Sequence, residues 1–382
     1  MTDPRAQLSP TRFPGANGEW ARFDGPAGTQ MVDVAIRAAS EWSAGGNNAN
    51  THGAFAQAHA TDALLERARV VVGQLLDADP RGVCFGANMT TMTFALTRAI
   101  ARTLQPGDRV VGTQLDHDAN VSPWRIACEE SGAEHVLAPF SIPDGRLDMK
   151  ALADLITPNT KWVAVTGASN LIGTMPDLRA VIALARHVGA RVFVDAVHLV
   201  PHMPVSVRQL GCDVLATSPY KWYGPHAGVM CIEPNLLNAL PVAKVRPADD
   251  VGPRRFETGT PNLETSPQPK PLPDSCWKKA WKTLQPTNAK CLLHYLRVCS
   301  PCRTCRCGAR PRLKRARPPW RLPCAARLPR KLRTPWLQRR SPCGMAAHMQ
   351  LKLFHDSVSP TPAESCAQVW CAMYRTTTWH DS

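Results

Sequence analysis

Long apolar runs are lacking in this 382-residue chain. None approaches the ~18–20 residues that a helix needs to cross a bilayer. The first residues, MTDPRAQLSPTRFPG, also lack the apolar segment of a secretory signal peptide. From these absences we expect no membrane partner, no signal peptide, and the cytoplasm as the location. The sequence shows no internal repeat.

Acidic residues are scarce in the last third of the chain. Residues 266–382 hold 4 Asp and Glu against 22 Lys and Arg, a balance of +18. Residues 1–265 hold 26 against 23, a balance of −3. The net charge of +15 therefore belongs to the C-terminal part. We expect no nucleic-acid binding beyond non-specific attraction through that basic tail.

Cysteine divides at the same point, with 4 of 14 before Ser266. After it, Pro, Arg and Trp accumulate, and proline at this density prevents long helices and central strands. Three interpretations stay open: a frame-shifted or wrongly spliced tail, a cysteine-rich metal module, and a diverged small domain or basic interaction tail. Cys299, Cys302, Cys305 and Cys307 have ligand-like spacing, but no second cluster completes a zinc domain. Disulfides are not expected in a cytosolic chain.

The first 265 residues alternate between short apolar runs and amphipathic segments separated by Gly, Pro and Asp loops. This alternation predicts a three-layer α/β domain with a mostly parallel sheet. We divide the chain into an N-terminal arm (1–45), this domain (46–265) and the atypical tail (266–382). Helices are predicted within 32–45 and at 60–76, 91–104, 124–131, 149–156 and 178–188, and strands at 83–85, 109–112, 133–138, 162–166, 191–194, 213–217 and 229–232.

Two of the predicted strands each lead to a charged residue. One ends on Asp195, and the other runs into Ser218 and Lys221. Charged residues at the carboxyl ends of parallel strands indicate a site at that sheet edge. Asp195 is either a loop or capping carboxylate or an acid facing a pyridinium nitrogen. Lys221 is either solvated or the amine that binds pyridoxal phosphate, since that cofactor needs both a lysine and an acid.

Two further clusters follow strands. Met89, Thr90 and Thr91 stand where a strand turns into a helix, and they form either an ordinary cap or an anion site. His117 lies between Asp116 and Asp118, which invites a metal interpretation. However, adjacent side chains diverge and no second cluster follows, so we predict no metal and favour an imidazole stacked on a ring.

The order of the motifs resembles class V aminotransferases, a group of fold-type I pyridoxal-phosphate enzymes, and within it the cysteine-desulfurase-like branch. The similarity covers residues ~20–265. The matching stretches are Phe23–Thr29, Gly86–Thr91, Asp116–Asn120 with Pro123-Trp124, Ser169-Asn170 with Gly173-Thr174, Asp195–His198, Ser218–Lys221 with Gly224-Pro225, and Glu257–Asn262.

This resemblance implies roles for single residues. Lys221 forms the Schiff base and moves protons at the substrate Cα, while Asp195 pairs with the pyridinium nitrogen and His117 stacks on the ring. The further implied cofactor contacts are Asn170 and His198 at the phenolic oxygen, Met89, Thr90 and Ser218 around the phosphate, Tyr220 beside the lysine, and Thr260 at the phosphate of a neighbouring subunit in a homodimer.

The resemblance also sets the expected activity. It implies a pyridoxal-phosphate enzyme acting on a small amino acid by desulfurase-like or aminotransferase-like chemistry. His198 and Tyr220 replace the Gln and His that desulfurases usually have, which indicates a divergent branch. The rival hypothesis is a catalytically impaired member with a non-functional or polyanion-binding tail. The cysteines before Ser266 lie in predicted core segments, so we expect them to be buried and structural: Cys84, Cys128, Cys212 and Cys231.

Overall fold

Seven strands form one sheet in the computed structural model, which describes residues 24–46 and 50–263. Their order across the sheet is β1-β7-β6-β5-β4-β2-β3. Five neighbouring strands, from β6 through β3, run parallel, and β7 pairs antiparallel with both β6 and β1. The strands are β1 (Val83–Gly86), β2 (Arg109–Thr113), β3 (Glu134–Ala138), β4 (Thr160–Thr166), β5 (Arg191–Asp195), β6 (Val214–Thr217) and β7 (Gly228–Ile232).

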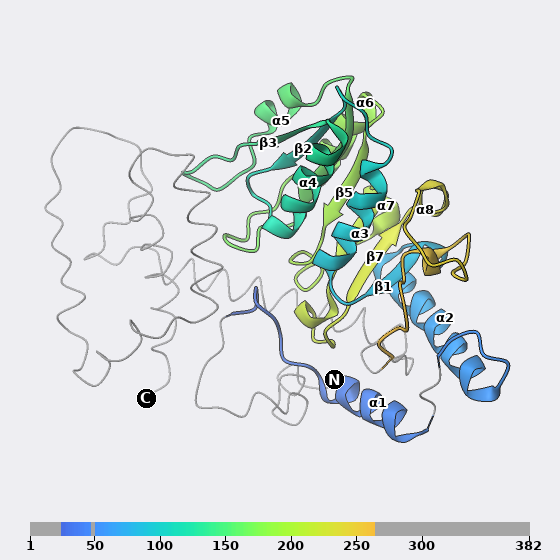
Figure 1. Ribbon diagram of the computed structural model, residues 1–382. Helices are drawn as coiled ribbons and strands as arrows, with labels where there is room; N and C mark the ends of the chain where they lie inside the picture. Colours follow the sequence, from blue (N-terminus) through green and yellow to red (C-terminus); the bar gives the residue numbers. More distant parts are fainter. Residues whose placement is uncertain (1–23, 47–49, 264–382) are drawn as a thin grey trace, which may run out of the picture. The chain divides into compact units, whose positions relative to one another are not determined.

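Helices cover both faces of this sheet, and α3 and α4 run in front of it in Figure 1. This arrangement confirms the predicted α/β fold with a mostly parallel sheet. The helices are α1 (Asp33–Ala44), α2 (Ala56–Leu76), α3 (Met89–Ala101), α4 (Ser122–Ser131), α5 (Met149–Leu155), α6 (Leu178–His187), α7 (Val207–Leu210) and α8 (Pro234–Ala239). Short 3₁₀ turns are η3 (Pro80–Gly82), η4 (Asp118–Asn120), η5 (Pro219–Lys221) and η6 (Pro253–Arg255).

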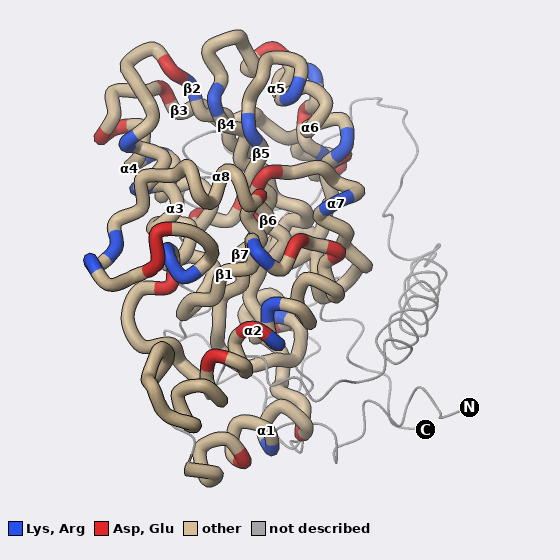
Figure 2. Tube along the Cα trace, turned by 90° about the vertical axis from the view of Figure 1, so that its right-hand side faces the viewer, with Lys and Arg blue, Asp and Glu red and all other residues tan. Residues whose placement is uncertain are grey.

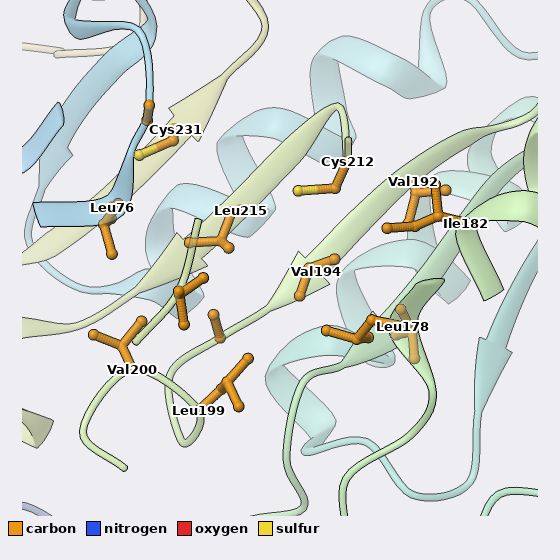
Figure 3. Packing of buried hydrophobic residues seen from close by; sticks show 14 of the residues in the cluster. Leu76, Leu178, Ile182, Val192, Val194, Leu199, Val200, Cys212, Leu215 and Cys231 are labelled. Atoms are coloured by element: carbon orange, nitrogen blue, oxygen red, sulfur yellow. The ribbon is translucent and has the colours of Figure 1, made fainter. Parts of the chain in front are cut away.

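Alternate residues of the central strands supply two separate cores. Val192 and Val194 of β5 pack with α2, α5 and α6, while Phe193 between them packs with α3, α4 and α8. Figure 3 shows Val192 and Val194 beside Leu215 in the first of these clusters. Strands buried on both faces read as continuous apolar runs, which is why their positions follow from the sequence.

Most predicted elements exist, with small differences at their ends. Helix α2 begins at Ala56, four residues before the predicted start, and α3 ends at Ala101 instead of 104. Helices α7 and α8 were not predicted, because four and six residues are too few to show helical periodicity. Asp148 caps α5, since its carboxylate accepts the amides of Lys150 and Ala151.

The four cysteines of the described residues are buried, as the sequence predicted. Cys84, Cys128, Cys212 and Cys231 carry free thiols in the cores. Burial raises the pKa of the last three to about 12. None of them is therefore an available thiolate near neutral pH.

Some sequence predictions lie outside the described residues. These are the first part of the arm and the whole tail, residues 266–382, with its open interpretations. Among the residues that are described, no helix is long and apolar enough to cross a membrane. Figure 2 shows Lys and Arg interspersed with Asp and Glu along the described chain, consistent with the nearly neutral balance of residues 1–265.

Candidate active site

A pocket of about 490 Å³, open to solvent, lies at the carboxyl edge of the parallel strands. The ends of β4 and β5, the loops after β2 and β6, and the start of α3 all contribute to it. Its position follows from topology, because loops that follow parallel strands meet at one edge. The lining residues are Pro26, Met89, Thr90, His117, Ala119, Thr166, Ala168, Asn170, Asp195, Val197, His198, Tyr220 and Lys221.

Asp195 supplies a buried carboxylate at the end of β5. The residue is 5% exposed, and one carboxylate oxygen accepts the Val197 amide at 2.9 Å. Burial raises its pKa to about 6, while the Val197 amide and the charge of Lys221 oppose that rise. Asp195 thus holds its own loop and also lines the pocket.

Lys221 brings an amine to the same pocket from η5, after β6. Strands β5 and β6 are parallel neighbours, with Asp195 in register with Ala216. The amine donates to the Pro26 carbonyl and lies 5.2 Å from the centre of the Tyr220 ring. Desolvation lowers the pKa of Lys221, whereas Asp24 and Asp195 raise it. Desolvation is the largest of these effects, so the pKa of Lys221 lies below that of an exposed lysine.

Asn170 presents an unpaired polar atom to the pocket. It follows β4 in the loop that ends with Gly173, and its Oδ1 is buried without a hydrogen-bond partner. A buried acceptor left unpaired is costly and indicates a missing ligand atom or water.

His117 stands on the pocket side of the loop after β2, while its neighbours point elsewhere. Its Nδ1 accepts the Ala119 amide at 3.0 Å, which leaves the proton of the neutral ring on Nε2. Asp116 is buried and accepts the Asn120 side-chain amide at 2.7 Å, and Asp118 accepts the Ser122 hydroxyl. The three side chains diverge, and no group of three metal-binding side chains occurs in the described residues.

His198 lines the pocket three residues after Asp195. Its ring meets that of His202 edge-on, with 5.0 Å between centres. Desolvation, then His202 and Lys221, lower the pKa of His198 to about 4. The ring is therefore neutral near pH 7 and can both donate and accept a hydrogen bond.

The N-terminus of α3 forms one wall through Met89 and Thr90. Asn88 caps this helix by accepting the Thr91 amide at 2.8 Å. Ser218 is fully buried behind this wall, and its Oγ accepts the Met89 amide at 3.2 Å. The structure thus places Ser218 against α3, outside the pocket lining.

Thr260 lies away from the pocket, exposed in the segment that follows Glu257. Glu257 fixes that segment through a bidentate ion pair with buried Arg69, whose Nη1 and Nη2 donate to the two carboxylate oxygens at 2.6 and 2.7 Å. It also accepts the Phe85 amide at 2.8 Å. Sequence reasoning missed Arg69, because an arginine on an amphipathic helix usually reads as a solvated residue.

The structure brings together eight of the ten residues proposed from the sequence and leaves out Ser218 and Thr260. It adds lining residues that carry no chemical signal of their own, namely Pro26, Ala119, Thr166, Ala168 and Val197. Pro26 was within a matching motif, but nothing in that motif showed that it reaches the lysine.

A family model for class-V aminotransferases matches residues 22–265. The chain belongs to this family. Its curated relatives include the uncharacterized protein MT3887 of Mycobacterium tuberculosis, 34% identical over 64% of this chain and 62% of that protein. Another is a cysteine desulfurase of Klebsiella pneumoniae, 32% identical over 63% of each chain.

Solved structures agree with the family. The cysteine desulfurase CsdA of Escherichia coli matches with a TM-score of 0.62 and 28% identity, over 70% of this chain and 69% of that one. A cysteine desulfurase of Thermococcus onnurineus matches with a TM-score of 0.63 and 25% identity, over 68% of each. The chain spans slightly under two thirds of the length of these curated relatives.

Proposed function

We propose that the protein is a pyridoxal-phosphate enzyme acting on a small amino acid, by cysteine desulfurase-like or class V aminotransferase-like chemistry. One observation carries this proposal. Lys221 and buried Asp195 reach a single pocket from neighbouring parallel strands. A lysine and an acid in one pocket are the pair that this cofactor requires.

The residues present fit the cofactor. The unpaired Oδ1 of Asn170 and the buried carboxylate of Asp195 are polar groups that a polar ring ligand satisfies. The start of α3 supplies the helix N-terminus that binds phosphate groups.

Bound in this way, the cofactor supplies an electron sink for bonds at the substrate Cα. Lys221 would hold the cofactor covalently and would move a proton at the substrate Cα, roles that its lowered pKa favours. Asp195 keeps a proton on the ring nitrogen by ion pairing.

The remaining pocket residues orient the ring. His117 covers one face, with its tautomer fixed by the Ala119 amide. His198 and Asn170 would hold the phenolic oxygen of the cofactor, and Tyr220, whose ring lies beside the Lys221 amine, would support the lysine. Thr90 and Met89 contribute the phosphate site, to which Ser218 also belongs by holding the Met89 amide. Thr260, outside this pocket, would bind the cofactor phosphate of the neighbouring subunit in a homodimer.

The described pocket lining holds neither an arginine nor a cysteine. The pocket lining contains no arginine for a substrate carboxylate. The cysteines within residues 24–46 and 50–263 are all buried, so none of them is positioned as a sulfur acceptor. We therefore assign the cofactor site to residues of the 46–265 domain together with Pro26 of the arm, and make no assignment of substrate-binding residues.

Cofactor titration tests this proposal. Added pyridoxal phosphate should produce a visible absorption band with the wild-type protein, and Lys221→Ala should not produce it. With cysteine, desulfuration releases alanine and sulfur, whereas transamination releases a keto acid, so product analysis separates the two chemistries. A protein that stays colourless at saturating cofactor contradicts the proposal.

The second candidate is a catalytically impaired protein with a polyanion-binding or non-functional tail. The charge division of −3 and +18 favours it. It predicts a normal cofactor band without turnover of any small amino acid, and salt-dependent retention on a polyanion column that is lost when residues 266–382 are removed. Replacing these residues with an in-frame family tail should restore turnover if the tail is the defect.

A further inference from the structure

Tyr223 has an unusual backbone conformation two residues after Lys221. Its φ is +69°, in the left-handed region that non-glycine residues rarely adopt. Such strain persists only where surrounding contacts hold it, and it concentrates at functional sites. The contacts that hold Tyr223 therefore bear on how Lys221 is placed.

The hydroxyl of Thr29, in the arm segment, makes the decisive contacts. Its Oγ1 accepts the Tyr223 amide at 2.8 Å and donates to the Tyr220 carbonyl at 3.1 Å. One hydroxyl thus bonds the backbone immediately before Lys221 and again two residues after it. Because Thr29 is 194 positions away in sequence from Tyr223, this is a tertiary clamp and not a local turn.

Backbone bonds strengthen the same attachment. The Thr29 amide donates to the Tyr220 carbonyl at 2.8 Å, and the Val32 amide donates to the Tyr223 carbonyl at 3.1 Å. Lys221 itself donates to the carbonyl of Pro26 in the same arm segment. The arm therefore contacts both the backbone of residues 220–223 and the side-chain amine of Lys221.

We propose that Thr29 is a positioning residue for Lys221, clamping the strained 220–223 turn so that the amine faces Asp195 across the pocket. This inference rests on the proposed function and adds to it a role for the arm. Thr29 touches neither the pocket nor the cofactor site directly, because it is absent from the lining. It acts through the backbone of residues 220–223, which include Lys221.

Two substitutions separate the hydroxyl from the shape of the side chain. Thr29→Val keeps the shape and removes both hydroxyl bonds, while Thr29→Ser keeps the hydroxyl. The matched control is Thr160→Val, since the Thr160 hydroxyl also accepts an amide, that of Thr157 at 2.9 Å, at the opposite end of β4. That control reports the general loss of a buried threonine hydroxyl.

The first measurement needs no cofactor. The full-length protein is acylated with limiting acetic anhydride over a range of pH, and modification of Lys221 is followed by mass spectrometry against exposed Lys150. Thr29→Val should raise the pH at which Lys221 is half modified, because an amine released from the clamp is more exposed to solvent. Thr29→Ser and Thr160→Val should leave this midpoint pH unchanged. An unchanged midpoint in Thr29→Val overturns the inference whether or not the protein binds pyridoxal phosphate.

The second measurement is the pyridoxal-phosphate concentration that gives half-maximal borohydride trapping on Lys221. Thr29→Val should raise it about tenfold, as expected for one to two lost hydrogen bonds. Thr29→Ser should stay within about twofold of wild type. If Thr29→Val instead behaves as Thr160→Val does, its hydroxyl is merely structural. If wild-type protein traps no cofactor, the proposed function fails, and the acylation midpoints still decide the role of Thr29.

Strain provides an independent check. Glycine adopts positive φ without penalty, so Tyr223→Gly should reduce the need for the clamp. The shift in the acylation midpoint caused by Thr29→Val should then be smaller in a Tyr223→Gly background than in wild type. Equal shifts in the two backgrounds contradict a coupling between Thr29 and the strained turn.

Discussion

Asp195 is a carboxyl that the fold keeps buried at a cost to stability. Its pKa of about 6 lies above the ordinary 3.8, so the folded protein holds this proton more tightly than the unfolded chain does. The folded state is therefore disfavoured progressively as the pH rises from about 4 to about 6, and the full penalty remains above that range.

Asp195→Asn should accordingly stabilise the cofactor-free protein at pH 7.5. The gain is up to about 3 kcal/mol, and it should shrink toward zero near pH 4. Urea unfolding of both proteins at several pH values measures it. The same variant should lose cofactor binding, because the neutral amide cannot pair with the ring nitrogen. Equal unfolding free energies at pH 7.5 would show that the ionised Asp195 carboxylate does not destabilise the folded protein.

Single residues of the site were predictable where type and strand position coincided. Asp195, Lys221 and His117 each follow a strand, so their meeting at one edge follows from the parallel topology. The pairing of Thr29 with Tyr223 was not predictable, because a backbone φ and a contact over 194 positions leave no pattern in the sequence.

At the scale of elements, α3 carries the proposed phosphate site. Asn88 caps the helix by accepting the Thr91 amide, and its loss should fray the first turn, which contains Met89 and Thr90. Asn88→Ala should lower the unfolding free energy by about 1 kcal/mol and also weaken pyridoxal-phosphate binding.

A control separates the two effects. Asp148 caps α5, which packs beside edge strand β3 away from the pocket. Asp148→Ala should cost a similar unfolding free energy and leave cofactor affinity unchanged. If both variants weaken cofactor binding equally, the effect is one of general stability and not of the α3 N-terminus.

The strands and long helices could be predicted because their burial leaves a pattern in the sequence, a continuous apolar run for the central strands and helical spacing of apolar residues for the helices. Strand β5 is buried on both faces, and α6 shows helical spacing between Leu178 and Ala185. The short helices α7 and α8 could not be predicted, since their ends depend on tertiary contacts and on caps such as Ser206.

At the scale of the whole molecule, one buried ion pair joins distant parts of the chain. Arg69 of α2 is 1% exposed and binds Glu257 with two hydrogen bonds, and it also donates to the Val83 carbonyl. This holds the segment that carries Thr260 against the start of the sheet.

Arg69→Met should lower the unfolding free energy by about 3–5 kcal/mol, because it leaves the Glu257 carboxylate unpaired. Exposed Arg81 pairs with Asp79 at the surface, so Arg81→Met should leave stability essentially unchanged. Parallel urea unfolding curves measure the difference, and similar midpoints for the two variants would rule out a structural role for the Arg69 pair.

The central claim is that Lys221 binds pyridoxal phosphate. Borohydride reduction of the protein with the cofactor, followed by protease digestion and mass spectrometry, tests it most directly. If Lys221 binds the cofactor, the cofactor mass is added to the peptide containing Lys221, and Lys221→Ala abolishes this addition. Cofactor spread evenly over exposed lysines, or found on none, would contradict the claim.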